Sequence, residues 1–326
     1  MVLKANAPKE IELNAADTSS LDLATPRQGR FFARSRGWAR ERTQFVVLML
    51  IPPVVLLVGL IALPFLIGLG VSFTDYMLSN PPARFSGFTN YQDLLRAGEF
   101  WQALRLTLLF TVVAVAIQTA LGVGLAVLLH AETRHVPMLR MLYLLPMAVT
   151  PVAATFTFRM MFNPSLGVLN YLLGLVGLPP QDWLGNGDLA LISLLLVDTW
   201  QHTPFILLIV GGGLASLPAE PFEAARIDGA SAWQTFTLIT LPLLKPFLAI
   251  AVLFRAIDAF KTFDIIFVLT AGGPGTSTTT LNVYAYKQAI EFVSLGYGAA
   301  IAIVMMLIVT IAAMLFLRRT RLLSVA

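Results

Sequence analysis

Long apolar stretches separated by short polar segments dominate the chain from residue 45 onward. Each is close to the roughly 20 residues that an α-helix needs to cross a hydrocarbon core about 30 Å thick. Six such stretches occur, at residues 45–73, 105–129, 139–162, 189–213, 247–270 and 296–317. A single span in lipid must satisfy its backbone hydrogen bonds internally, which favours helices. The pattern therefore predicts an all-α integral membrane protein with six transmembrane helices.

Prolines punctuate several of these stretches and are expected to kink or end helices. They stand at positions 52, 53, 64, 146 and 151.

Composition narrows the class of protein further. Of the 326 residues, 57% are hydrophobic and only 12% are charged, and the mean hydropathy of +0.78 is too high for an ordinary soluble domain. The absence of cysteine excludes disulfides and thiolate metal sites. The three histidines, His130, His135 and His202, do not have metal-binding spacing. We expect no metal site in this chain.

The chain also offers little for catalysis. It contains no G-x-x-x-x-G-K-[ST] pattern, so ATP hydrolysis is not expected in this subunit. No Ser/His/Asp arrangement has a recognisable local context. We predict that the protein is not an enzyme and holds no cofactor.

Lysine and arginine are distributed unequally between the two sides of the predicted spans. One side carries Arg27, Arg30, Arg34, Arg36, Arg40, Arg42, Arg134, Arg140, Arg226, Lys245, Arg318, Arg319 and Arg321. The other side carries chiefly Arg84, Arg96 and Lys287. Because cytoplasmic loops are rich in positive charge, we predict that both termini are cytoplasmic. Arginines this close to a span argue against nucleic-acid binding.

This topology divides the chain into three parts. Residues 1–42 form a polar cytoplasmic tail that we expect to be disordered, and residues 43–318 form the six-span domain. Within that domain, residues 214–246 make a cytoplasmic loop, and residues 319–326 are a short cytoplasmic tail.

The loop over residues 214–246 has the signals of two short helices joined by a corner. Pro218 and Pro221 suit the first turn of a helix, and Glu223 lies near its positive N-terminal end. Gly229 is suited to a left-handed conformation that ends this helix. Ser231 is a ready N-cap for the second helix, which we expect to stop by Pro242.

The complete string in this loop resembles the coupling loop of bacterial ABC importer permeases, especially those of carbohydrate uptake such as the maltose and glycerol 3-phosphate permeases. The residues that carry the resemblance are Glu223, Ala224, Ala225, Asp228, Gly229, Ala230, Leu241 and Pro242. Gly272-Gly273-Pro274 after the fifth span resembles an outer string of the same family. The resemblance implies the type I permease fold and assigns these eight residues to docking on an ATPase subunit.

The same resemblance implies a set of partners. These are a second permease, two ATPase subunits that use ATP and Mg, and an extracytoplasmic solute-binding protein that delivers the ligand. It also implies a multi-pass location in the lipid of the bacterial cell (inner) membrane and a sugar or sugar derivative as ligand.

Polar residues within the spans form two matching stripes. Positions i, i+3, i+4 and i+7 are occupied by Asp198, Gln201, His202 and Phe205 in the fourth span, and by Arg255, Asp258, Ala259 and Thr262 in the fifth. Intramembrane charges are costly and usually functional or paired, so we predict one shared substrate cavity near the bilayer midplane. By resemblance, these eight positions match the sugar-contacting places of the maltose permease.

The residue identities differ from that permease, which leaves the ligand open between a sugar and an anionic derivative such as glycerol 3-phosphate. A structural alternative is that Arg255 and Asp258 simply form a pair within their helix.

A second polar set, Lys261 and Asp264, is expected on another side of the same helix. We interpret it as structural, pairing within the bundle or against the second permease. Phe260 and Phe267 flank Asp264, and we expect them to pack rather than to form a sugar platform.

Two other functional classes remain possible at this point. An ion-coupled carrier would use Asp198, Asp258 and Asp264 as proton or sodium sites. A membrane enzyme would use Asp258 or His202 as an acid–base group. Neither class needs the coupling-loop string on the cytoplasmic side.

Overall fold

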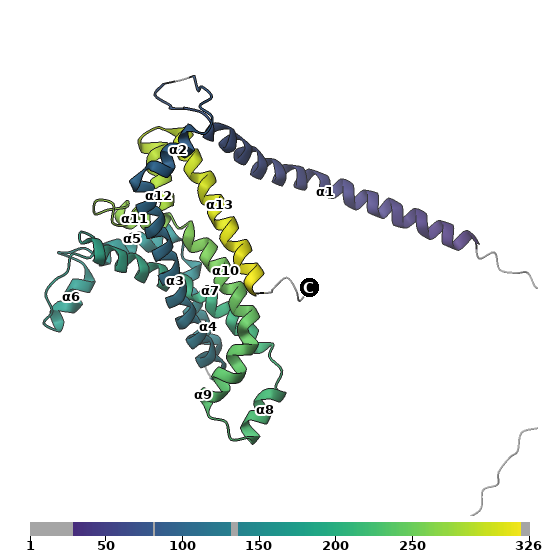
Figure 1. Cartoon of the computed structure of the whole chain (residues 1–326). Helices are drawn as coiled ribbons and strands as arrows, with labels where there is room; N and C mark the ends of the chain where they lie inside the picture. The colour runs from purple at the N-terminus through teal and green to yellow at the C-terminus, as the bar shows by residue number, and fades with distance from the viewer. Residues whose placement is uncertain (1–28, 81, 132–135, 321–326) are drawn as a thin grey trace, which may run out of the picture. The chain divides into compact units, whose positions relative to one another are not determined.

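The computed structural model describes residues 29–80, 82–131 and 136–320. The helices are α1 (Gly29–Ser72), α2 (Thr89–Arg96), α3 (Gly98–Ala131), α4 (Val136–Ala148), α5 (Pro151–Met161), α6 (Val168–Leu175), α7 (Gly187–Ala215), α8 (Glu220–Ile227), α9 (Ala232–Thr235), α10 (Leu241–Phe260), α11 (Asp264–Thr270), α12 (Leu281–Tyr286) and α13 (Leu295–Thr320) (Figure 1). Two π-helical turns cover Phe236–Thr240 and Lys287–Glu291. The all-α fold predicted from the sequence is confirmed.

The chain divides into two units, residues 1–63 and 64–326. In the first unit, α1 already begins at Gly29, upstream of the predicted span and inside the tail that we expected to be disordered. Residues 1–28 of that tail and residues 321–326 of the C-terminal tail fall outside the described part of the chain. The large apolar side chains of α1 from Phe45 to Leu63 are exposed.

Five helical segments of the described chain are long and apolar enough to cross a membrane. They are Gln44–Ser72, Gly98–His130, Gly187–Ala215, Ala232–Phe260 and Leu295–Thr320. The third predicted span, over residues 139–162, is divided between α4 and α5, which meet at an angle of 98°. Thr150 is extended there (ψ 137°), because the ring of Pro151 disfavours a helical conformation in the preceding residue.

The fifth span was predicted as one helix over residues 247–270, and this was wrong. Helix α10 ends at Phe260, Lys261 leaves the helical conformation, and α11 starts only at Asp264. The Asn282 side chain donates a hydrogen bond of 2.6 Å to the Lys261 carbonyl, which replaces a bond that a continuous helix would make. Neither a proline nor a glycine marks this break in the sequence.

The second helix of the loop does not stop by Pro242, as we had expected. Helix α9 continues through the π-helical turn into α10, whose first turn contains Pro242. Proline lacks the N–H that an α-helical bond would need, and a first turn tolerates that loss. The span therefore starts earlier, at Ala232.

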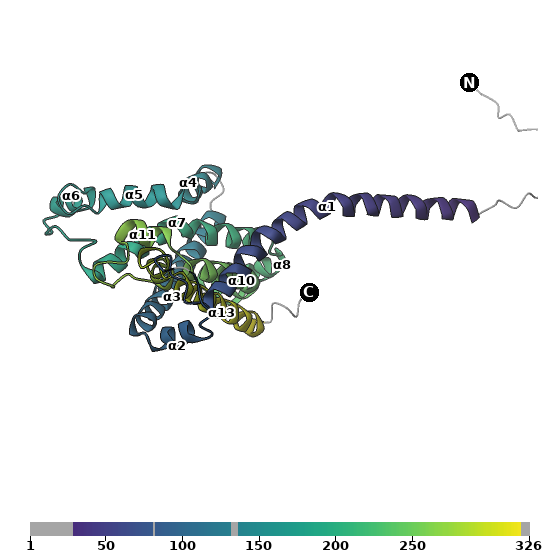
Figure 2. The ribbon, with the colours of Figure 1, turned by 90° about the horizontal axis from the view of Figure 1, so that it is seen from above.

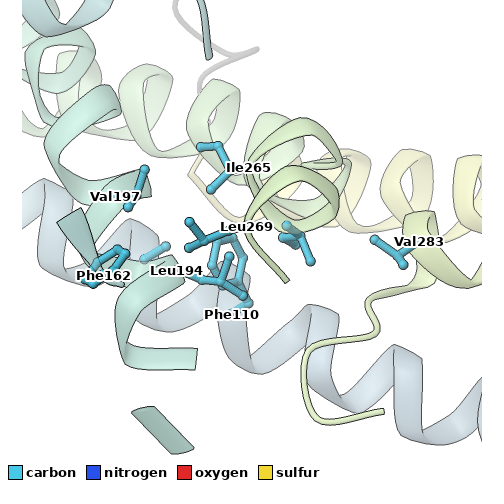
Figure 3. Close-up of a cluster of buried hydrophobic side chains, with 9 residues drawn as sticks. Phe110, Phe162, Leu194, Val197, Ile265, Leu269 and Val283 are labelled. Carbon is cyan, nitrogen blue, oxygen red and sulfur yellow. The ribbon is translucent and has the colours of Figure 1, made fainter. Parts of the chain in front are cut away.

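In the second unit, α3, α7 and α10 pack against one another and form the centre of the bundle. Phe110 of α3, Leu194 and Val197 of α7, and Ile265 and Leu269 of α11 meet in one buried cluster (Figure 3). This cluster fixes α11 against the upper part of the bundle.

A glycine permits the closest approach of α3 to α7. A Cβ added at Gly122 would lie 2.6 Å from Cγ2 of Ile206, a distance that real side chains do not adopt. Small residues at such crossings let transmembrane helices pack closely.

The connections gather at two ends of this unit. Helices α8 and α9 lie at one end of the bundle, and α2 and α12 lie at the other (Figure 1). Seen from above, α4, α5 and α6 follow one another along one side (Figure 2). The loop over residues 214–246 is therefore at the opposite end of the bundle from α2 and α12, which belong to segments predicted on the outer side.

Candidate functional site

The coupling loop (residues 214–246) begins with helix α8. Pro221 stands in its first turn, as the sequence predicts, together with the acidic residues Glu220 and Glu223. Carboxylates at this end are stabilised by the helix dipole. Ala225 is buried, whereas Glu223 and Ala224 are exposed. One face of α8 thus packs against the protein, and the other face is exposed.

The corner after α8 has the predicted backbone. Gly229 has φ +75°, a left-handed conformation that other residues resist. The amide of Ala230 donates to the Ala225 carbonyl at 2.9 Å, which closes the end of the helix. Ser231 then caps α9 through a reciprocal pair of bonds with Gln234. The two helices are therefore held at a defined corner by local bonds.

Large apolar side chains of the coupling loop are exposed. Ile227, Trp233 and Leu238 are 86%, 71% and 72% exposed. Asp228 and Gly229 are also exposed. Exposed apolar groups rimmed by polar ones are typical of a surface that meets another protein.

The polar residues of the spans meet in what we call the polar cluster: Gln118, Asp198, His202, Arg255 and Asp258. Arg255 is only 1% exposed and lies at its centre. Its Nε donates to Oε1 of Gln118 at 2.6 Å, its Nη1 to Oδ2 of Asp258 at 3.0 Å, and its Nη2 to Oδ2 of Asp198. The cluster joins α3, α7 and α10.

Asp198 is fully buried and has partners from all three helices. Besides Arg255, the amide of Gln118 donates to its Oδ2 at 2.7 Å, and Nδ1 of His202 lies 3.0 Å from its Oδ1. Buried charges need such paired and hydrogen-bonded surroundings. Oδ2 of Asp198 is thus paired within the protein, whereas Oδ1 is buried beside Nδ1 of His202 and has no hydrogen-bond partner among the described residues.

The other end of the cluster reaches the surface. The side chain of Asp258 is 53% exposed and that of His202 is 22% exposed, with Nε2 of His202 at 3.7 Å from Oδ2 of Asp258. These two groups are the accessible part of the polar cluster.

Gln201 belongs to a separate contact. Its amide donates to the Val149 carbonyl at 2.8 Å, at the break between α4 and α5. Its Oε1 is buried and has no hydrogen-bond partner among the described residues. Gln201 therefore stabilises the broken span and leaves one acceptor unused.

Known proteins resemble this chain along most of its length. Residues 164–321 match the family model described as "Binding-protein-dependent transport system inner membrane component". The probable ABC transporter permease protein y4oQ of Sinorhizobium fredii is 41% identical over 265 residues, covering 81% of this chain and 85% of that protein. The chain belongs to this family of ABC importer permeases.

Other relatives extend the comparison. The trehalose/maltose transport system permease protein MalF of Thermococcus litoralis is 37% identical to this permease, covering 80% of it and 88% of the relative. A solved bacterial ABC transporter that imports the acidic polysaccharide alginate has a TM-score of 0.76, covering 88% of this chain and 98% of the matched chain. At 20% sequence identity, this structure supports the fold.

Family membership settles the broad class. Permeases of this family are multi-pass membrane proteins and transport components, not enzymes, and they need no cofactor of their own. The enzyme alternative considered for Asp258 and His202 is therefore removed. The family also implies an importer that contains a binding protein, a second permease and an ATPase.

The structure brings some of the predicted substrate residues together and separates others. Asp198, His202, Arg255 and Asp258 share the polar cluster, and Gln201 faces the break beside it. Phe205 is half-buried against an apolar cluster between α3, α7 and α10, and Ala259 is buried.

Thr262 does not continue the stripe of Arg255 and Asp258, because α10 ends at Phe260. Its hydroxyl bonds back to the Asp258 carbonyl at 3.3 Å.

Two further predictions for this region assumed one continuous helix, and that assumption was wrong. Lys261 and Asp264 are not on one helix, and neither side chain makes an ion pair within the described residues. Phe260 and Phe267 likewise belong to different helices, although both pack as expected. Phe260 enters a buried cluster, and Phe267 stacks on Phe263 and meets Tyr286.

Sequence reasoning missed Gln118. This residue is completely buried in the second span and bridges Asp198 and Arg255. A lone amide inside a long apolar stretch was the available signal, because polar groups in a span usually find a polar partner.

Proposed function

We propose that this permease is one of two permease subunits of a bacterial inner-membrane importer for a sugar or sugar derivative. Two ATPase subunits would supply energy from ATP and Mg, and an extracytoplasmic binding protein would deliver the ligand. The names of relatives support the ligand class, since they include trehalose/maltose and sulfoquinovosyl glycerol transport permeases. A related alginate importer has been solved with its binding protein, which supports the delivery step.

The observation that carries the proposal is the preformed corner of the coupling loop. A left-handed Gly229 and a doubly bonded Ser231 cap hold α8 and α9, while Glu223, Ile227 and Trp233 stay exposed around them. A surface that is rigid and partly apolar suits docking, because little conformational entropy is lost on binding. Closure of the ATPase subunits would then move this corner and, through α7 and α10, the polar cluster.

Co-purification tests this role directly. The tagged permease, solubilised from its native membrane, should retain an ATPase subunit and a second permease. Glu223→Lys should reduce ATPase retention at least about tenfold, because it reverses a charge that we expect to meet a basic group of the ATPase. Glu291→Lys is the matched control, since Glu291 is also exposed and ends the π-helical turn Lys287–Glu291, outside the coupling loop.

Either of two results would rule out the docking role of the coupling loop. One is that the permease purifies without an ATPase subunit. The other is that the Glu223→Lys variant retains the ATPase subunit as well as the Glu291→Lys control does.

Topology gives an independent prediction. The chain has no cysteine, so single cysteines can report on each side of the membrane. We expect Leu178→Cys to react with an impermeant thiol reagent in intact cells and Glu220→Cys to react only after lysis. Both positions are exposed. The reverse labelling pattern would invert the predicted orientation and place both termini outside.

A further inference from the structure

A second cavity, which we call the outer cavity, lies at the end of the bundle opposite the coupling loop. Its volume is about 800 Å³, and its walls come from α2, α3, α12, the π-helical turn Lys287–Glu291 and the start of α13. None of the five residues of the polar cluster lines it. Small-molecule sites in proteins typically enclose about 300–1,000 Å³. The size of the outer cavity therefore suits a small molecule.

The wall that includes the π-helical turn has an uncommon backbone. Val293, just after this turn, has φ +56°, a left-handed conformation that β-branched residues resist. Backbone bonds hold the segment in place: the Leu78 amide donates to the Val293 carbonyl at 3.1 Å, and the Gly296 amide donates to the Tyr76 carbonyl at 3.0 Å. Both π-helical turns and strained residues are frequent at functional sites. The backbone of this wall therefore points to a function for the outer cavity.

Three charged residues line the outer cavity, namely Asp93 of α2, Glu99 of α3 and Lys287. None of them makes an ion pair in the part of the chain that the structure describes. Asp93 and Glu99 are exposed, and Lys287 is half-buried. Ionised carboxylates accept strong hydrogen bonds from hydroxyl groups, and an ammonium group donates them. The three charged groups are thus available to a polar ligand.

Aromatic rings and an amide complete the lining. The rings of Tyr284 and Tyr297 are 6.5 Å apart at an angle of 84°, and their hydroxyls are 3.2 Å apart, so one of the two hydroxyl hydrogens is not used in this bond. The Gln102 amide donates to Oγ1 of Thr276 at 2.9 Å, which leaves Oε1 of Gln102 as an acceptor. This combination of groups suits a sugar, whose hydroxyls form hydrogen bonds while its C–H faces pack on aromatic rings.

We propose that the outer cavity binds the imported sugar on its way to the polar cluster. Asp93 and Glu99 accept hydrogen bonds from sugar hydroxyls, Lys287 donates to sugar oxygens, and Tyr297 packs against the face of a sugar ring. The inference rests on the proposed importer function and on the predicted orientation, in which this end of the bundle faces the binding protein. It adds a second ligand site to the permease, in series with the membrane site predicted from the sequence.

The alternative occupant is a basic side chain of a docked protein, because Asp93 and Glu99 supply two negative charges and Lys287 only one positive charge. Two observations favour the sugar. A single lysine or arginine side chain would fill only a small part of a cavity of about 800 Å³. Lys287 would also repel such a side chain, whereas it can donate a hydrogen bond to a sugar oxygen.

Protection of a single cysteine from modification tests this site, because the chain has no cysteine of its own. Gln288 lines the outer cavity, and Leu178 does not. We expect trehalose, maltose or glucose to slow the reaction of Gln288→Cys with an impermeant thiol reagent and to leave the reaction of Leu178→Cys unchanged. The protein is the assembled importer in nanodiscs, without the binding protein, and labelling is measured on this subunit.

Variants on the Gln288→Cys background identify the groups that hold the sugar. Glu99→Gln and Asp93→Asn should each raise the sugar concentration for half-maximal protection about 10- to 100-fold, since each removes a charge-assisted hydrogen bond. Glu291→Gln is the matched control, because Glu291 is exposed at the end of the π-helical turn and does not line the outer cavity. This control should leave the protection unchanged.

Three results would overturn the inference. The first is that the sugars protect neither cysteine, and the second is that Glu99→Gln and Asp93→Asn change the protection no more than Glu291→Gln does. The third is that arginine methyl ester protects Gln288→Cys where the sugars do not, which would assign the outer cavity to a basic side chain of a partner protein. Each leaves the importer role standing, because co-purification with the ATPase tests that role separately.

Discussion

Arg255→Gln is expected to destabilise the permease by about 3–5 kcal/mol, because it leaves the buried Asp198 carboxylate without its cationic partner. Asp198 is 0% exposed and cannot turn to water for compensation. The loss should appear as a lower thermal midpoint of the solubilised protein and a lower yield from membranes. Lys261→Gln, which removes an exposed positive charge just after the same helix, should leave both unchanged.

Double variants identify which aspartate depends on Arg255. Adding Asp198→Asn to Arg255→Gln should recover much of the lost stability, since no buried charge then remains unpaired. Adding Asp258→Asn should recover little, because Asp258 is half-exposed and can be solvated. Equal recovery in the two double variants would show that the helix-internal pair of Arg255 and Asp258 carries the stability, contrary to the burial of Asp198.

Gly229→Val is expected to abolish coupling while the permease still inserts. A β-branched residue resists φ +75°, and the left-handed conformation costs roughly 1–2 kcal/mol for a residue with a side chain. No atom lies within 4 Å of the added Cβ, so the effect would come from the backbone and not from a clash. The corner should open, and ligand-stimulated ATP hydrolysis and uptake should both be lost.

Gly177→Val provides a close control for this experiment. Gly177 has φ +76°, is exposed, and also has no atom within 4 Å of an added Cβ. It precedes α7, well outside the coupling loop, so similar strain should leave ATP hydrolysis and uptake near wild type. Equal loss of transport in both variants would mean that general destabilisation, and not the corner, explains the effect.

Local signals in the sequence were sufficient to predict the features that depend on interactions between residues close to one another in the chain. The apolar stretches predicted the helical membrane fold, because spans in lipid must bond internally. In the coupling loop, Pro221, Gly229 and Ser231 predicted a first turn, a left-handed end and a cap, and the structure has all three. Each of these features depends on residues within five positions of one another.

Boundaries inside apolar stretches were less predictable. The break after Phe260 has no proline or glycine to announce it, and its freed carbonyl is satisfied by Asn282, which lies 21 residues away. The sharp bend at Pro151 was signalled as a kink or an end, but its 98° angle depends on neighbouring helices such as α7, whose Gln201 bonds the Val149 carbonyl. The packing of neighbouring helices determines these boundaries and bend angles, and the periodicity of residues along one helix carries no information about that packing.

The polar cluster depends most on the tertiary structure. The stripes of the fourth and fifth spans predicted that Asp198 and Arg255 would face one another, since both spans flank the coupling loop. The sequence could not show that Gln118 completes the set, because it lies 80 residues from Asp198 and 137 from Arg255. Nor could it show which carboxylate stays exposed. Buried charges need paired and hydrogen-bonded partners, and only the packing of α3, α7 and α10 determines which groups are close enough to provide them.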